Sequence, residues 1–215
     1  MKESVFIQFF GGVPFCDVTD AFPLIPFGRW LLPVSICLLA AGYYAERNRR
    51  WELLSAYRYG TAKNWWRKRF GKGILGGVLT AALLMLFFIV WDMIMGKSFG
   101  VLGEQMIKIS ILWLFHIISM YALFLLLDLF GARRVVPAAL LLFEGVTFVM
   151  AFWMKETADM AYGMWGMYFR SGWYIGGQGF RVRRVLTLEC LILAVCYYGG
   201  KLYVTALRRV KRKTT

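Results

Sequence analysis

Residues 46–73 read ERNRRWELLSAYRYGTAKNWWRKRFGKG and form the only long polar interval in an otherwise apolar sequence. Aromatic and basic residues recur in it at steps of three and four, as at Trp51, Leu54 and Arg58. A helix with this spacing presents aromatic and basic surfaces. We expect Gly60 to divide the interval into two short helices, because glycine costs about 1 kcal/mol relative to alanine inside a helix.

The composition of the chain indicates a membrane protein. Apolar residues make up 60% of the 215 residues and aromatic residues 18%, whereas soluble domains are roughly half apolar. A soluble domain of this length has too little core volume to bury so much apolar surface. The net charge of +14 is explained by basic residues that flank apolar spans and contact anionic lipid headgroups. Since the chain has no DNA- or RNA-binding motif, no nucleic-acid partner is expected.

Five apolar segments approach the ~20 residues that cross a ~30 Å hydrocarbon layer. They are residues 30–45, 74–95, 107–130, 135–154 and 185–205. The first segment is short, its start lies at residue 30 or a few residues earlier, and Pro33 is expected in its opening turn, where proline is tolerated. The predicted fold is an all-α membrane protein with about five transmembrane helices.

Residues 1–28 precede these spans and are harder to interpret. Pro14, Pro23 and Pro26 argue against one continuous helix. An external or re-entrant segment and an unstructured tail are both compatible with this composition. Residues 29–215 are expected to form a single transmembrane helical domain.

The distribution of basic residues predicts the orientation. With residues 46–73 in the cytoplasm, the inner side carries seventeen of the Lys and Arg residues and the outer side nine. Short loops rich in Lys and Arg remain on the cytoplasmic side. We therefore expect a multi-pass protein of a bacterial plasma membrane, with its N-terminus outside and its C-terminus inside. Three basic residues on the outer side, just before the last span, do not follow this rule, namely Arg181, Arg183 and Arg184.

Ionisable residues fall inside several of the predicted spans. His116 and Glu144 lie well inside theirs, whereas Asp92, Asp128 and Glu189 are nearer the span ends. An unpaired charge in lipid is costly, so such residues often mark a polar path or a lock between helices. The alternative is that they are neutral, face a wet cavity or lie closer to an interface.

Motifs for catalysis or cofactor binding are missing from the sequence. It has one histidine, no HExxH, no paired carboxylates at helical spacing and no GxSxG turn. The four cysteines lack CxxC or zinc spacing. The glycine-rich FGKGILGG at residues 70–77 does not match a phosphate-binding loop. We predict no catalytic, cofactor-binding or metal-binding residues, and nucleotide chemistry would require another chain.

The outer loop of residues 155–184 combines aromatic residues with glycines. Tyrosine and tryptophan favour the interface between membrane and water. The loop is therefore expected either to dip into the outer leaflet as a re-entrant segment or to cover the bundle as an interfacial belt. The candidate residues are Tyr162, Trp165, Tyr168, Phe169, Trp173 and Tyr174.

The order of these segments resembles the permease subunit of an ABC-2 type transporter, the type V exporter fold. That family places a coupling helix between its second and third spans and short re-entrant helices before the sixth. Residues 53–70, LLSAYRYGTAKNWWRKRF, are similar to a pattern in small permeases of bacterial peptide and lantibiotic export or immunity systems. The family's first span has no counterpart, and residues 1–28 would align with the external connection that follows it.

The resemblance implies that residues 46–73 dock on an ABC ATPase subunit, which would bind ATP and Mg²⁺. The residues carried over to this docking surface are Trp51, Glu52, Leu54, Tyr57, Arg58, Tyr59, Gly60, Lys63, Trp65 and Trp66. A second permease subunit and membrane lipid are the other implied partners, and the substrate would be an amphipathic peptide or lipid. The alternatives are a helix that lies along lipid headgroups and a non-transporting structural or regulatory scaffold.

Overall fold

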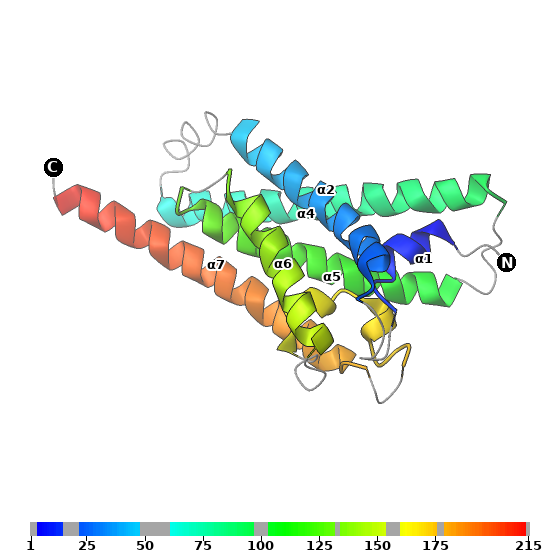
Figure 1. Ribbon diagram of the computed structural model, residues 1–215. Coiled ribbons are helices and arrows are strands. Elements are labelled where there is room, and N and C mark those ends of the chain that lie inside the picture. The colour runs from blue at the N-terminus through cyan, green and yellow to red at the C-terminus, as the bar shows by residue number, and fades with distance from the viewer. Residues whose placement is uncertain are drawn as a thin grey trace.

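The computed structural model describes residues 4–14, 22–47, 61–96, 103–131, 134–153, 160–175 and 179–213 (Figure 1). The helices are α1 (Val5–Phe10), α2 (Leu24–Arg47), α4 (Ala62–Ile94), α5 (Gly103–Asp128), α6 (Val136–Trp153), η2 (Tyr162–Met164), η3 (Tyr168–Arg170) and α7 (Val182–Lys213). Apart from one β-bridge between Ser171 and Phe180, all regular structure in these residues is helical.

Five helices in the described part of the chain are long and apolar enough to cross a membrane, namely α2, α4, α5, α6 and residues Val182–Ala206 of α7. This confirms the predicted all-helical fold with about five spans. The first span begins at Leu24, and Pro26 is tolerated there because the N–H groups of the first helical residues lack partners within the helix. Pro33 consequently lies inside α2, and its expected position in the opening turn was wrong.

Helix α4 joins the polar interval directly to the second span. It begins at Ala62, just after Thr61, whose Oγ1 accepts a hydrogen bond from the backbone N–H of Asn64 at 3.3 Å. It then continues for 33 residues to Ile94, so residues 62–73 do not form a separate short helix. The expected break at Gly60 and the first expected short helix lie outside the described residues.

Helix α5 is the centre of the bundle. It contacts α1, α2, α4, α6 and α7. In its apolar stretch of 18 residues, 61% of the residues are buried inside the protein, against 17% in the corresponding stretch of α4. Glycines allow α4 to approach it closely, since a Cβ added at Gly77 would lie 2.7 Å from the Tyr121 ring. The opposite face of α4 exposes Leu79, Leu83 and Phe87, as expected of a helix that faces lipid.

Buried polar contacts fix the end of the bundle at which α4 begins. Arg69 of α4 forms an ion pair with Asp128 at the end of α5, and both side chains are almost fully buried. The Trp66 indole N–H donates to the carbonyl oxygen of Tyr197 in α7 at 2.7 Å. The end of α2 lies at this same end of the molecule, and α7 extends beyond it toward the C-terminus (Figure 1).

The N-terminal helix α1 is fixed to the opposite end of α4. Asp92 accepts hydrogen bonds from the hydroxyl of Ser4 and from the backbone N–H groups of Val5 and Phe6, the latter two at 2.9 Å. Phe10 packs edge-on against Trp113 of α5, with ring centroids 4.6 Å apart. Residues 4–14 are therefore docked on the bundle, with helix α1 over Val5–Phe10, and do not form a free tail.

Candidate functional site

Four side chains from four helices meet in the interior, and we call them the His116 cluster. His116 of α5 lies between two carboxyl groups, with Nε2 3.1 Å from Oε1 of Glu144 in α6 and Nδ1 3.4 Å from Oε1 of Glu189 in α7. The indole N–H of Trp30 in α2 donates to the same Glu144 oxygen at 3.2 Å. All four residues have 0% exposed surface.

The helical register places this cluster deep within the spans. His116 lies twelve residues before Asp128 in α5, and Glu189 lies twelve residues before Lys201 in α7. At the helical rise of 1.5 Å per residue, both separations are about 18 Å. A hydrocarbon layer is about 30 Å thick. A hydrocarbon layer with its boundary at Asp128 and Lys201 would therefore contain the cluster near its middle.

The loop of residues 160–175 closes over the cluster between α5 and α6. The Tyr162 hydroxyl lies 2.6 Å from the hydroxyl of Ser119 in α5. The backbone N–H of Gly163 donates to Oγ1 of Thr147 in α6 at 2.9 Å. A Cβ added at Gly163 would lie 2.3 Å from the Glu144 carbonyl oxygen, so only glycine permits this close approach.

A second glycine brings the same loop against the His116 side chain itself. A Cβ added at Gly166 would lie 2.9 Å from both the His116 ring and the Trp30 ring. The Tyr162 ring centroid is 4.8 Å from that of His116. The loop thus packs directly against two members of the cluster, and any movement of the loop would change the surroundings of His116.

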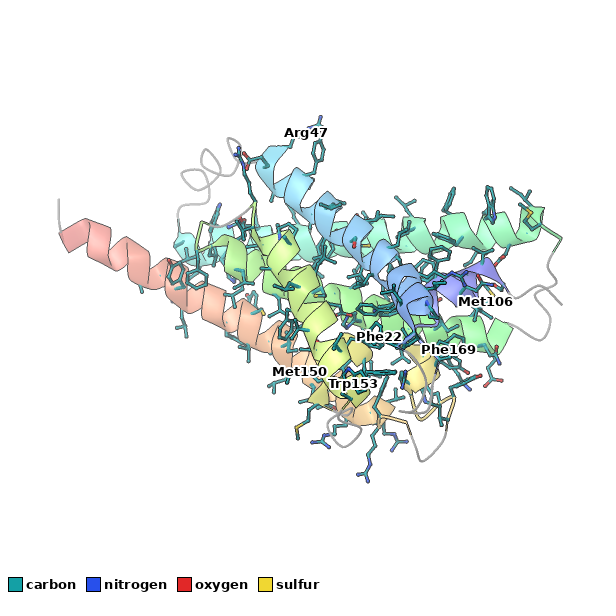
Figure 2. All side chains as sticks on the ribbon, in the orientation of Figure 1. Phe22, Arg47, Met106, Met150, Trp153 and Phe169 are labelled. Carbon is teal, nitrogen blue, oxygen red and sulfur yellow. The ribbon has the colours of Figure 1, made fainter. Side chains whose placement is uncertain are left out.

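The N-terminal segment holds the far side of this loop. The Arg170 guanidinium donates to the carbonyl oxygens of Val13 and Pro14 at 3.0 and 2.9 Å, and the Phe169 N–H donates to the carbonyl of Gly11 at 2.9 Å. Figure 2 shows Phe22, Trp153 and Phe169 in one half of the molecule, with Arg47 at the other end of α2. The loop is therefore fixed between the helical bundle and residues 11–14.

The six aromatic residues expected to act together in the outer loop differ in exposure. Tyr162, Trp165 and Tyr168 are buried, and Phe169 is half-buried. Trp173 and Tyr174 are 37% and 53% exposed. The structure therefore places the first part of the loop in the protein interior and leaves the last two aromatic residues at its surface.

The predicted docking surface lies mostly outside the described residues, which include none of its positions from Trp51 to Gly60. Lys63 is exposed, and Trp65 is half-buried with its ring 5.1 Å from the Arg69 guanidinium. Trp66 is fully buried. Its indole packs within the bundle in this structure, which differs from the expectation that it faces a partner, because it fills the space beside Gly200.

His116 and Glu144 were predicted as polar residues inside the membrane, but their contacts with Glu189 and Trp30 were not predicted. Glu189 was expected near the end of its span because the span was taken to begin at residue 185, whereas α7 begins at Val182. One feature of the sequence could have predicted the contact of Glu189 with the cluster. Glu189 is the only acidic residue in α7, and a lone carboxyl group in an apolar helix needs a polar neighbour.

The groups of the His116 cluster can exchange protons and hydrogen bonds. Among the described residues, no group of three or more His, Cys, Asp or Glu side chains is arranged to hold a metal ion. An imidazole between two carboxyl groups can bind and release protons, because all three groups are titratable. No protein-family model, curated protein sequence or solved structure matches this chain.

Proposed function

We propose that this chain is the membrane-spanning permease subunit of an ATP-driven exporter, with ATP and Mg²⁺ bound by a separate ATPase subunit. The observation that supports this proposal best is the continuity of α4. Its first turns lie in the basic and aromatic interval, and the same 33-residue helix forms the second span. Without a hinge between the two parts, a displacement applied to the first turns is transmitted across the bilayer.

The buried contacts at the start of α4 extend this displacement to other spans. The Arg69–Asp128 ion pair joins α4 to α5, and the hydrogen bond from Trp66 to Tyr197 joins it to α7. Closure of a partner ATPase against this region would therefore move three spans together as a rigid body.

At the other end, α4 leads to the outer loop. Asp92 holds the N-terminus of α1, and Arg170 joins residues 13–14 of the same N-terminal segment to the loop. We infer that the loop acts as a re-entrant segment at the outer side, where it gates the exit of an amphipathic peptide or lipid. The exporter would contain a second, identical or related permease subunit, in a bacterial plasma membrane with the N-terminus outside.

A non-transporting scaffold is the second candidate function. The packing of α5 against five other helices suits a rigid support for other membrane proteins. The two functions differ in their partners, because a scaffold needs no ATPase.

The decisive experiment is purification of the full chain with its native membrane partners, followed by reconstitution in lipid vesicles. We expect an ATPase with a GxxxxGK[ST] loop to accompany the chain and to be stimulated by it. Lys63 and Arg67 are exposed one turn apart at the start of α4. The variant K63E/R67E is expected to lower stimulated ATP hydrolysis and transport by about tenfold or more, because charge pairs within an interface contribute 1.4 kcal/mol or more.

The matched control reverses two exposed charges at the other end of the bundle. R181E/R183E changes the net charge equally, and both arginines are exposed at the start of α7. It should retain stimulated hydrolysis. Purification without any ATPase, or equal effects of the two double variants, would favour the scaffold.

A further inference from the structure

We propose that His116, Glu144 and Glu189 form a proton-binding site, and that release of one proton from this site unseats the loop of residues 160–175. The inference goes beyond the proposed function and does not depend on an ATPase partner. It rests on the position of His116, 3.1 Å from Glu144 and 3.4 Å from Glu189, on the absence of exposed surface on all three groups, and on the contacts of the loop with the cluster.

Charge balance requires the cluster to hold protons. Among the described residues, neither Glu144 nor Glu189 contacts a Lys or Arg side chain. With both carboxyl groups ionised and His116 neutral, the cluster would carry two uncompensated negative charges away from water, which is very costly. Two bound protons make it neutral, and loss of either leaves a net charge of minus one.

The hydrogen bonds indicate where the two protons reside. Oε1 of Glu144 faces two nitrogen donors, the Trp30 indole and His116 Nε2, and a carboxylate is the best acceptor for two donors. His116 is therefore the protonated partner of Glu144. Glu189 faces a single donor, His116 Nδ1, at the longer distance of 3.4 Å and outside hydrogen-bond geometry, so it is the less stabilised carboxylate and carries the second proton as a neutral carboxylic acid.

The other groups that face the cluster do not supply this proton. They are Trp30 from α2 and Tyr162 from η2, with Ser119 from α5 hydrogen-bonded to Tyr162 and the Cys196 thiol from α7 near it. Burial raises the pKa of Tyr162 well above its ordinary value, so its phenol stays neutral while the cluster titrates. The proton that is exchanged therefore belongs to the cluster itself.

The loop is the part of the structure that responds to the charge. Gly163 lies against the backbone of Glu144, and Gly166 lies against the ring of His116, so the loop keeps water from both. Water stabilises a net negative charge, and water reaches the cluster only when the loop moves away from it. The packed position of the loop is thus favoured at low pH and lost as the pH rises. For one proton, the equilibrium constant between the two positions changes by up to about tenfold per pH unit.

The test measures the position of the loop in the full chain, reconstituted alone in lipid vesicles. Nitroxide labels are attached at Y174C in the loop and L202C in α7, two exposed positions, with Cys16, Cys37, Cys190 and Cys196 replaced by alanine. Distance distributions between the labels are recorded by electron spin resonance from about pH 5 to about pH 10. Perturbed carboxyl and imidazole groups of proteins titrate within this range. A second distance population is expected to grow as the pH rises.

The variant E189Q mimics the protonated carboxyl and should keep the loop seated throughout the range in which the parent protein changes. E104Q is the matched control, since Glu104 is exposed and paired with Lys108 in α5, and it should behave like the parent. A parent protein without a pH-dependent population, or an E189Q variant with the same midpoint as E104Q, would overturn the proposal.

Infrared difference spectroscopy of the parent protein gives a second measurement that needs no folded E189Q variant. A band from a protonated carboxyl should disappear with the same midpoint as the loop transition, in the parent and in E104Q alike. Absence of such a band would also overturn the proposal. Because no ATPase is present, failure here leaves the proposed export function standing, and failure of ATPase binding leaves the proton site standing.

Discussion

Individual glycines determine how closely the helices pack at the residue scale. Gly199 and Gly200 are adjacent in α7, yet their surroundings differ completely. A Cβ at Gly200 would lie 2.2 Å from the Trp66 ring, whereas a Cβ at Gly199 would have no atom within 4 Å. Gly200 is therefore required by packing, and Gly199 is not.

Gly200→Ala is expected to destabilise the protein by about 1–3 kcal/mol, the usual cost of overpacking a close contact. Gly199→Ala is the matched control and should be neutral or stabilising by up to about 1 kcal/mol, because alanine favours the helix. Thermal unfolding of both variants in detergent measures the difference. Equal stabilities would mean that Trp66 does not occupy the space beside Gly200.

The chemistry of the His116 cluster also arises at this scale, and only part of it was predictable. His116 and Glu144 stood out because ionisable residues are rare inside apolar spans. That Glu189 and Trp30 complete the cluster was not predictable, because four helices contribute one residue each and sequence spacing does not show how helices rotate against one another.

At the scale of elements, the start of α4 is fixed to its neighbours by polar contacts in an apolar bundle. Arg69 and Asp128 are nearly fully buried, and the Arg69 guanidinium also lies over the Trp65 ring. A buried ion pair contributes little beyond the cost of its desolvation, but loss of one partner leaves a buried charge. The pair therefore specifies how α4 and α5 meet.

Asp128→Leu alone is expected to cost about 3–5 kcal/mol, because it leaves the Arg69 charge buried without this partner. The double variant R69L/D128L should recover much of that loss, since it removes both charges from the interface. Chemical unfolding in detergent micelles provides the free energies. A double variant less stable than D128L would show that the ion pair itself holds the two helices together.

The element boundaries show the limits of sequence reasoning. The predicted spans were confirmed as five apolar helices, because long apolar segments are readily recognised. The expected separate helix over residues 62–73 was not observed, since Lys63, Arg67 and Lys72 continue the helical surface of α4 without a cap or proline to end it.

At the scale of the whole molecule, α4 connects the two ends of the bundle. Arg69 and Asp92 lie 23 residues apart in this helix, which corresponds to about 35 Å, slightly more than a hydrocarbon layer of about 30 Å. One polar anchor joins α4 to α5, and the other joins it to α1. A straight α4 is therefore the shortest connection between the end of the bundle at Arg69 and the end at Asp92, beside α1.

A kink in the middle of α4 should interrupt this connection while leaving its ends intact. Leu83 is 66% exposed on the outward face, so Leu83→Pro creates little steric conflict with other helices but bends α4 at a cost of about 3 kcal/mol. We expect L83P to retain ATPase binding and to lose most transport per ATP hydrolysed. L83A, which keeps the helix straight, should transport normally. Vesicle transport and ATP hydrolysis measured together separate the outcomes, and unchanged transport in a folded L83P protein would mean that α4 does not carry the movement.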